Sequence, residues 1–174
     1  ARKNNTEICL IADEPYRLLN LDNVEIPSLF SVYANSVVIG SYSKNLSLAG
    51  ERIGYVAVNP AMPCAEELIR AVTLTTRILG YVNAPTVAQQ ILKSCIDSQV
   101  DLNIYRERRA AMAKVLDDAG IEYTMPRGAF YFFPRSPLAD ASKFIEKLVE
   151  DRSLAVSGRG FGCPGYIRLA VCVS

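Results

Sequence analysis

The sequence contains no histidine and no tryptophan, and its five cysteines are scattered without a CxxC pair. Without histidine, the chain itself cannot supply a Ser-His or Cys-His catalytic pair. The lack of histidine and of paired cysteines also argues against a zinc site. We therefore expect free thiols, buried in apolar segments as in proteins of a reducing cytoplasm. The five positions are Cys9, Cys64, Cys95, Cys163 and Cys172.

The sequence also lacks a large excess of either positive or negative charge, and it has no long apolar run. The net charge is +1, and acidic and basic residues are interspersed without a basic patch. This balance of charge does not favour binding to nucleic acid or to an anionic membrane. No apolar run approaches the length of a membrane span, and no signal peptide is visible. The 174 residues can bury a proper core in one domain or two small ones, and we expect a cytoplasmic location.

The sequence does contain a polar loop with a lysine, Lys44, near one end and an arginine, Arg52, near the other. The apolar runs 37–39 and 55–58 flank this loop and are typical of buried strands. Buried parallel strands have such continuous apolar runs, and ligands collect at their carboxyl ends. A solvated surface loop is the simpler explanation for a lone lysine, so the functional interpretation depends on further residues.

A second segment supplies such residues. A strand-like run over residues 7–12 ends in the carboxylate of Asp13, and Tyr16 follows across a proline. Taken alone, Asp13 could cap a turn or a helix, and Tyr16 could be half-buried packing. Arg52 could likewise pair with Glu51, and Arg168 could be a charge on an edge strand.

Together, these segments resemble the signature of class I/II aminotransferases, which are pyridoxal-phosphate enzymes of the aspartate-aminotransferase-like superfamily, fold type I. The matching segments are Asp13–Tyr16, Ser41–Lys44, Gly50–Tyr55, Arg127–Phe132 and Phe161–Leu169. They occur in the family's order and cover essentially the whole chain. Because members of this family are longer, the resemblance implies that the chain corresponds to their C-terminal half and lacks part of the active site.

The resemblance implies catalytic roles for three residues. Lys44 would form the internal aldimine with pyridoxal 5'-phosphate and, once released, would move the substrate proton. Asp13 would be the anionic partner that keeps the cofactor's ring nitrogen protonated. Tyr16 would donate a hydrogen bond to the ring oxygen of the cofactor.

The resemblance also implies binding roles. Ser41 and Arg52 would hold the cofactor phosphate, and Ser43 is a weaker candidate for the same role. Arg168 would bind the α-carboxylate of the substrate as a bidentate fork. Phe130 matches a family position near the substrate, although an aromatic side chain in a core strand is the more ordinary explanation.

The implied fold is α/β. Residues 1–85 would be the C-terminal portion of the large cofactor-binding domain, with parallel-type strands and helices. Residues 86–120 would form one long interdomain helix, on which the run Arg106–Arg109 is a solvated face. Residues 121–174 would be a small α+β domain. Within it, strands are expected at 121–125, 129–133, 154–156 and 166–173, with an amphipathic helix over 140–152.

The resemblance therefore implies transamination between an L-amino acid and a 2-oxo acid by a homodimer whose sites are completed across the subunit interface. Two alternatives remain open at this stage. The same residues serve C–S lyases and aminocyclopropane-carboxylate-synthase-like enzymes of the superfamily. A domain of this type also occurs as the effector part of transcriptional regulators. The substrate's side chain is not specified by the sequence, and Arg77 is a conceivable contact for an acidic one whose spacing does not match the family.

Overall fold

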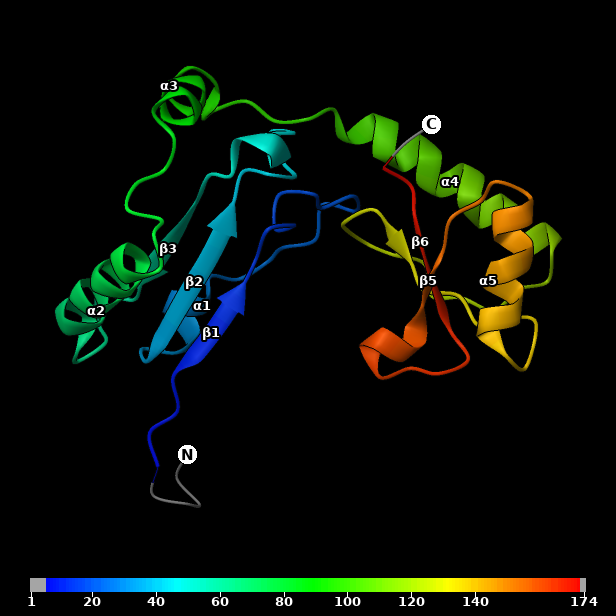
Figure 1. Ribbon diagram of the computed structural model, residues 1–174, viewed down its shortest axis with the longest axis horizontal. Helices are drawn as coiled ribbons and strands as arrows, with labels where there is room; N and C mark the ends of the chain where they lie inside the picture. The colour runs from blue at the N-terminus through cyan, green and yellow to red at the C-terminus, as the bar shows by residue number, and fades with distance from the viewer. Residues whose placement is uncertain (1–5, 173–174) are drawn as a thin grey trace. The chain divides into compact units, whose positions relative to one another are not determined.

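The computed structural model describes residues 6–172, and the chain has an α/β fold. The described residues form two compact units, each with its own small sheet and helices (Figure 1). Unit 1 comprises residues 6–18 and 25–100, and unit 2 comprises residues 19–24 and 101–172. Among the described residues, no helix is both long enough and apolar enough to cross a bilayer.

Unit 1 is built on a three-stranded sheet in the order β1-β2-β3, drawn from blue to teal in Figure 1. Strand β1 pairs with β2 in parallel, and β3 pairs with β2 antiparallel. Its elements are β1 (Leu10–Asp13), α1 (Leu29–Val32), β2 (Ser36–Ser41), the 3-10 helix η2 (Ala49–Glu51), β3 (Gly54–Val58), α2 (Ala65–Ile78) and α3 (Thr86–Cys95).

The antiparallel course of β3 corrects the prediction of parallel-type strands. A parallel connection requires a crossover that carries the chain back along the sheet, and that crossover is usually a helix. Residues 42–53 instead carry the three-residue helix η2 and return the chain directly alongside β2. The result is a mixed sheet in which the polar loop joins two neighbouring strands.

The prediction that these strands are buried holds only in part for β2 and is wrong for β1 and β3. Val37 of β2 is buried but Ile39 is 36% exposed. Ile11 of β1 is 60% exposed and Val56 of β3 is 47% exposed. An apolar run records the hydrophobicity of its side chains, but their exposure depends on which elements lie against each face of the sheet. The expected burial of the thiols is wrong for the same reason, because four cysteines are exposed and Cys95 is half-buried.

Unit 2 is a helix-and-sheet unit around a three-stranded antiparallel sheet in the order β4-β6-β5. Its elements are α4 (Leu102–Asp118), β4 (Tyr131–Phe132), α5 (Ala141–Glu150), β5 (Val156–Ser157), the 3-10 helix η3 (Gly158–Phe161) and β6 (Ile167–Ala170). Phe132 and Ile167 are almost fully buried and form the centre of its core.

The strand predicted at residues 121–125 does not form. The backbone N–H of Ile121 donates to the carbonyl of Leu116 and closes the C-terminus of α4, where Gly120 takes the left-handed conformation that such helix ends favour. The ring of Tyr123 then packs against Phe132 at a centroid distance of 5.5 Å. This segment therefore contributes to the core of unit 2 through its side chains and not as a strand of the sheet.

The long helix predicted over residues 86–120 is wrong, because the chain forms α3 and α4 with a break between them. The N–H of Val100 donates to the carbonyl of Asn45, and the Gln99 side chain donates to the carbonyl of Leu18. The carboxylate of Asp101 then caps α4 by accepting from the N–H of Asn103. These contacts interrupt the helix at the point where the chain passes from unit 1 to unit 2.

The arginines of α4 are not the solvated face that the sequence predicted. Arg106 donates to the carbonyl of Leu21 at 2.8 Å, and Arg108 donates to the carbonyl of Cys172 at 2.9 Å. Three of the four residues in the run Arg106–Arg109 are half-buried. A charge run on a helix is usually solvated, but here the arginines bind main-chain carbonyls that approach from distant parts of unit 2.

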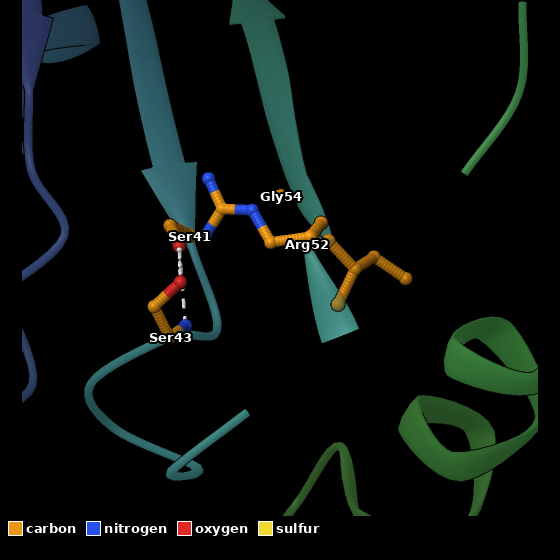
Figure 2. A pocket seen from close by; sticks show the side chains of 5 residues that line it. Ser41, Ser43, Arg52 and Gly54 are labelled. Carbon is orange, nitrogen blue, oxygen red and sulfur yellow. Dashed lines mark hydrogen bonds between the residues drawn. The ribbon is translucent and has the colours of Figure 1, made fainter. Parts of the chain in front are cut away.

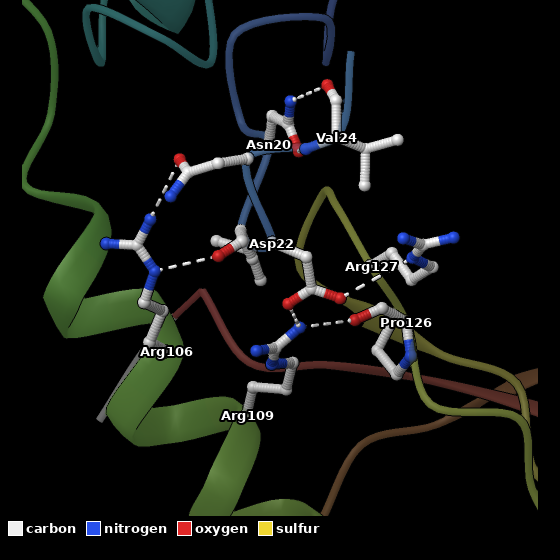
Figure 3. Close-up of polar contacts among 9 residues, drawn as sticks. Asn20, Asp22, Val24, Arg106, Arg109, Pro126 and Arg127 are labelled. Atoms are coloured by element: carbon white, nitrogen blue, oxygen red, sulfur yellow. Dashed lines mark hydrogen bonds and ion pairs between the residues drawn. The ribbon is translucent and has the colours of Figure 1, made fainter. Parts of the chain in front are cut away.

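Asp22 lies at the centre of this cluster, as Figure 3 shows. Its carboxylate is 2.7 Å from a guanidinium nitrogen of Arg109 and 3.6 Å from Nε of Arg127. The same Arg109 nitrogen donates to the carbonyl of Pro126 at 2.9 Å. One arginine thus connects the segment 19–24 and the turn before β4 to the side of α4.

Candidate active site

The polar residues predicted for the site begin on one face of the sheet of unit 1. In the β1–β2 pairing Asp13 lies opposite Ile39, and in the β2–β3 pairing Ser41 lies opposite Gly54. Because side chains alternate along a strand, Ile39 and Ser41 point to the same face. Asp13 and Ser41 therefore share that face.

Ser41, Ser43 and Arg52 line a shallow depression of about 160 Å³ at the end of β2, together with Ile53 and Gly54. Figure 2 shows the Arg52 side chain extending across it toward Ser41. The Ser41 hydroxyl donates to that of Ser43 at 2.7 Å and accepts from the Ser43 N–H at 3.1 Å. Two hydroxyls and a guanidinium therefore converge on one small space, and Ser43 belongs to the set as much as Ser41 does.

The backbone of Arg52 has an unusual conformation, with φ +53° and ψ +44° in the left-handed region. This region is uncommon for a residue with a side chain. Arg52 ends η2, and its guanidinium donates to the carbonyl of Ala49 at 3.0 Å. The tight return of the chain before β3 thus brings this exposed cation back over the end of β2.

Lys44 lies in the turn after β2, and its ammonium group approaches Tyr16, which comes from the turn after β1. The Nζ atom is 5.8 Å from the centroid of the Tyr16 ring, within the range of a cation–π contact. Both side chains are half-buried. The parallel pairing of β1 with β2 explains this meeting, because it puts the two carboxyl ends at the same edge of the sheet.

The other face of the sheet supports this loop with aromatic packing. Gly40 lies opposite Tyr55, whose ring covers it so closely that a Cβ on Gly40 would lie 2.2 Å from the ring's Cζ. The Tyr42 ring is 5.8 Å from that of Tyr55. Burial, followed by the charge of a neighbouring Tyr55 phenolate, raises the pKa of Tyr42 above its ordinary value of 10.0. Glycine at position 40 is therefore needed where β2 enters the loop.

Arg168, the predicted carboxylate ligand, lies in unit 2 on β6. Its Cζ atom is 4.6 Å from the centroid of the Tyr131 ring and 4.6 Å from that of the Phe161 ring. The sequence did not point to either ring as a neighbour of Arg168. Because side chains alternate between the two faces of a strand, the strand pattern partly indicates that Tyr131 can lie near Arg168. Phe161 reaches Arg168 from a loop, and the strand pattern does not describe loops.

The structure also places Phe130 and Arg77, which were considered from the sequence, and Arg159. Phe130 is buried and stacks on Tyr105 of α4 at 5.9 Å, so it is a core residue. Arg77 lies exposed in the last turn of α2. Arg159 is exposed on η3, where its backbone N–H donates to the Ser157 hydroxyl.

Comparison with known proteins decides the lineage of the chain. The profile of the family described as aminotransferase class I and II matches residues 1–174. The chain belongs to the class I and II aminotransferases. An aspartate aminotransferase of Thermotoga maritima is 32% identical over 178 residues, which are 100% of this chain and 45% of that protein.

Solved aminotransferase structures have the same fold. An aminotransferase of Eubacterium rectale superimposes with a TM-score of 0.87 at 42% identity, covering 94% of this chain and 41% of that one. The α-aminoadipate aminotransferase of Thermus thermophilus, solved in complex with N-(5'-phosphopyridoxyl)-L-leucine, superimposes with a TM-score of 0.76 at 25% identity. That match covers 92% of this chain and 44% of the other. This chain therefore spans less than half the length of these aminotransferases.

Proposed function

We propose that the chain is part of a pyridoxal-phosphate-dependent aminotransferase that uses Lys44 as the cofactor-binding lysine. The observation that carries this proposal is the group of side chains at one edge of the sheet of unit 1. Lys44 contacts Tyr16 there, and the depression is lined by Ser41 and Ser43, shortly before Lys44 in the chain, and by Arg52 at the end of the same loop. The family membership and the phosphopyridoxyl compound in the Thermus relative support the choice of cofactor.

The residues of the depression suit a phosphate group. A phosphate offers oxygen acceptors, and the depression offers the hydroxyls of Ser41 and Ser43 with the guanidinium of Arg52, a planar donor of fixed charge. A Cβ at position 54 would lie 2.5 Å from the carbonyl oxygen of Gly40, so glycine keeps the two strands close at this point. We assign these three polar side chains to the cofactor phosphate.

When bound, the cofactor would supply an electron sink for the cleavage of bonds at the substrate's Cα. Lys44 would hold the cofactor through its amine and would then take and return the proton at Cα. Asp13 shares the sheet face of Ser41 and would place an anion beside the cofactor's ring nitrogen. The Tyr16 phenol would donate a hydrogen bond to the ring oxygen while its ring contacts the Lys44 side chain.

We further propose that Arg168 binds the α-carboxylate shared by an amino acid and a 2-oxo acid. A guanidinium presents donors in a fixed fork that matches a carboxylate and fixes the orientation of Cα. Unit 1 would then belong to the large domain of the family and unit 2 to the small one. We also infer a homodimer, as the resemblance implies, with sites completed across the subunit interface.

Two other functions use the same lineage and predict different observations. A C–S lyase or an aminocyclopropane-carboxylate-synthase-like enzyme would consume an amino acid without needing a 2-oxo acid as the amino acceptor. A regulator would carry a DNA-binding domain elsewhere in its chain. Transamination is favoured because the relatives reported above are aminotransferases.

The experiment that tests this proposal maps the cofactor lysine. The protein is incubated with pyridoxal 5'-phosphate, reduced with borohydride and digested, and the peptides are searched for a covalently attached phosphopyridoxyl group. We expect the group on Lys44 in the wild type and none in Lys44→Ala. Lys114→Ala is the matched control, because Lys114 is an exposed lysine on α4 that pairs with Asp118. The assignment of Lys44 is wrong if Lys44→Ala is labelled as strongly as the control.

A further inference from the structure

Two aromatic rings hold the guanidinium of Arg168. Its Cζ atom is 4.6 Å from the ring centroids of both Tyr131 and Phe161, close to the distance at which a cation and an aromatic ring attract each other. Within residues 6–172, no carboxylate or carbonyl oxygen forms an ion pair or a hydrogen bond with this guanidinium. The rings therefore contact the cation while its N–H donors remain available.

The pairing of β4 with β6 explains the position of Tyr131. Tyr131 lies opposite Ala170, and Arg168 is two residues before Ala170 on the same face of β6. The small side chain of Ala170 leaves room, so the long arginine can reach the tyrosine diagonally across the strand pair. Phe130 packs against the Tyr131 ring at 4.7 Å and itself stacks on Tyr105 at 5.9 Å. These contacts restrict the position of the Tyr131 ring.

Aromatic packing and the loop around η3 fix the position of Phe161. The ring packs edge-on against Phe133 at 5.9 Å, and Phe133 stacks on Tyr166 at 5.5 Å with nearly parallel planes. The Ser157 hydroxyl caps the helix η3, at whose end Phe161 lies. At the start of that helix, a Cβ on Gly158 would lie 2.3 Å from the carbonyl oxygen of Cys163. This loop therefore presents Phe161 from a defined position although the side chain is 47% exposed.

We propose that Tyr131 and Phe161 are positioning residues that orient the Arg168 guanidinium for a substrate carboxylate. This inference depends on the role proposed for Arg168 above. A long arginine side chain loses rotamer freedom when it binds a carboxylate, and a guanidinium already held by two rings has less to lose. The rings attract the cation through their faces without accepting its hydrogen bonds. They therefore leave the N–H donors of the guanidinium to the substrate carboxylate.

Removing one of the two rings should weaken the binding of the substrate carboxylate, so it should change KM more than kcat. Losing one ring should weaken the hold on Arg168 by about two- to five-fold in carboxylate affinity, the range expected for an exposed cation–π contact. An amine that lacks the carboxylate never engages Arg168, so its KM should not respond to the ring.

The kinetic test uses the full protein and two probes. The first is the amino acid that the wild type converts faster, L-phenylalanine or L-alanine. The second is the corresponding amine, which has no carboxylate: 2-phenylethylamine or ethylamine. Phe161→Leu removes the ring, and Phe161→Tyr retains it. Each is measured alone, and Phe161→Leu is also measured in an Arg168→Leu background.

We expect Phe161→Leu to raise KM for the amino acid about two- to five-fold, with little effect on the amine, and Phe161→Tyr to restore the wild-type KM. In the Arg168→Leu background, removing the ring should have no further effect, because the ring acts through the arginine. An equal effect in both backgrounds, or an equal effect on the amine, would overturn the inference. If Arg168→Leu leaves the amino-acid KM unchanged, the proposed role of Arg168 fails and the inference fails with it. If Arg168→Leu raises KM and Phe161→Leu does not, the inference alone fails.

A second readout does not require turnover. The NMR signal of the Arg168 Nε–H group, assigned with Arg168→Lys, should be displaced by the ring currents of its two neighbours. Phe161→Leu should move that signal toward the position of a solvated arginine, and Phe161→Tyr should leave it in place. A signal that does not move in Phe161→Leu contradicts the contact on which the inference rests.

Discussion

The ion pair between Asp22 and Arg109 gives a sharp test of the structure of unit 2. The side chain of Arg109 is 17% exposed and that of Asp22 is 31% exposed, and their closest nitrogen and oxygen are 2.7 Å apart. Asp22→Ala leaves Arg109 with the carbonyl of Pro126 and no anion. A hydrogen bond to a charged group contributes about 1.5–3 kcal/mol, so we expect a loss of this size in the local stability of unit 2.

Hydrogen exchange measures this loss for unit 2 separately from unit 1. For amides that exchange by opening of the cluster, about 1.5–3 kcal/mol corresponds to roughly a ten- to hundred-fold faster exchange. The peptides to follow are those covering residues 19–24 and α4. Asp22→Asn, which keeps an oxygen acceptor but loses the charge, should give an intermediate effect.

The matched control is Asp118→Ala on the same helix. Asp118 pairs with Lys114, but the two side chains are 65% and 75% exposed. Such exposed pairs contribute about 0.5 kcal/mol or less, so the control should exchange nearly as the wild type does. Equal protection in Asp22→Ala and Asp118→Ala would refute the reasoning, because burial of the pair would then have no energetic consequence.

Two further predictions concern the loops around the candidate site. Gly158→Ala should lower the melting temperature by several degrees, because its Cβ would lie 2.3 Å from the carbonyl oxygen of Cys163. Gly160→Ala, whose Cβ would meet nothing within 4 Å, should not, and similar melting temperatures for the two variants would contradict the close approach. The raised pKa of Tyr42 means that the folded state favours the neutral phenol, so its contribution to stability is present below pH 10.0 and is lost as the pH rises through the raised pKa. Tyr42→Phe should therefore reduce the fall in stability above pH 10.0, and an unchanged slope in a comparison of denaturation curves would show that burial of this phenol does not matter.

The local part of the candidate site could be predicted well from the sequence. One short segment, residues 41–52, contains Ser41, Ser43, Lys44 and Arg52, with a single tight return of the chain before Arg52. The relative positions of these residues therefore depend mainly on the conformation of this segment. The convergence of Ser41, Ser43 and Arg52 in one depression agrees with the order of these residues in the sequence. The role of each side chain toward the cofactor stays a prediction that the experiments above address.

The interruption of the long helix could not be predicted in the same way. Residues 86–118 have the apolar spacing of a continuous helix, and no proline or glycine marks the break. The break depends on the carbonyls of Leu18 and Asn45, which lie more than fifty residues away in the sequence and bind Gln99 and Val100. A periodic pattern carries no information about such distant acceptors.

The sequence by itself determined the aminotransferase lineage, the amphipathic helix α5, and the polar loop that contains Lys44. These features depend on local chemistry, in which each residue acts on neighbours within a few positions. The tertiary structure alone decided that β3 is antiparallel, that the α4 arginines bind distant carbonyls, and that Tyr131 and Phe161 meet at Arg168. These features depend on strand register and on contacts between distant segments, because the same side chain is solvated or paired according to what the fold brings beside it.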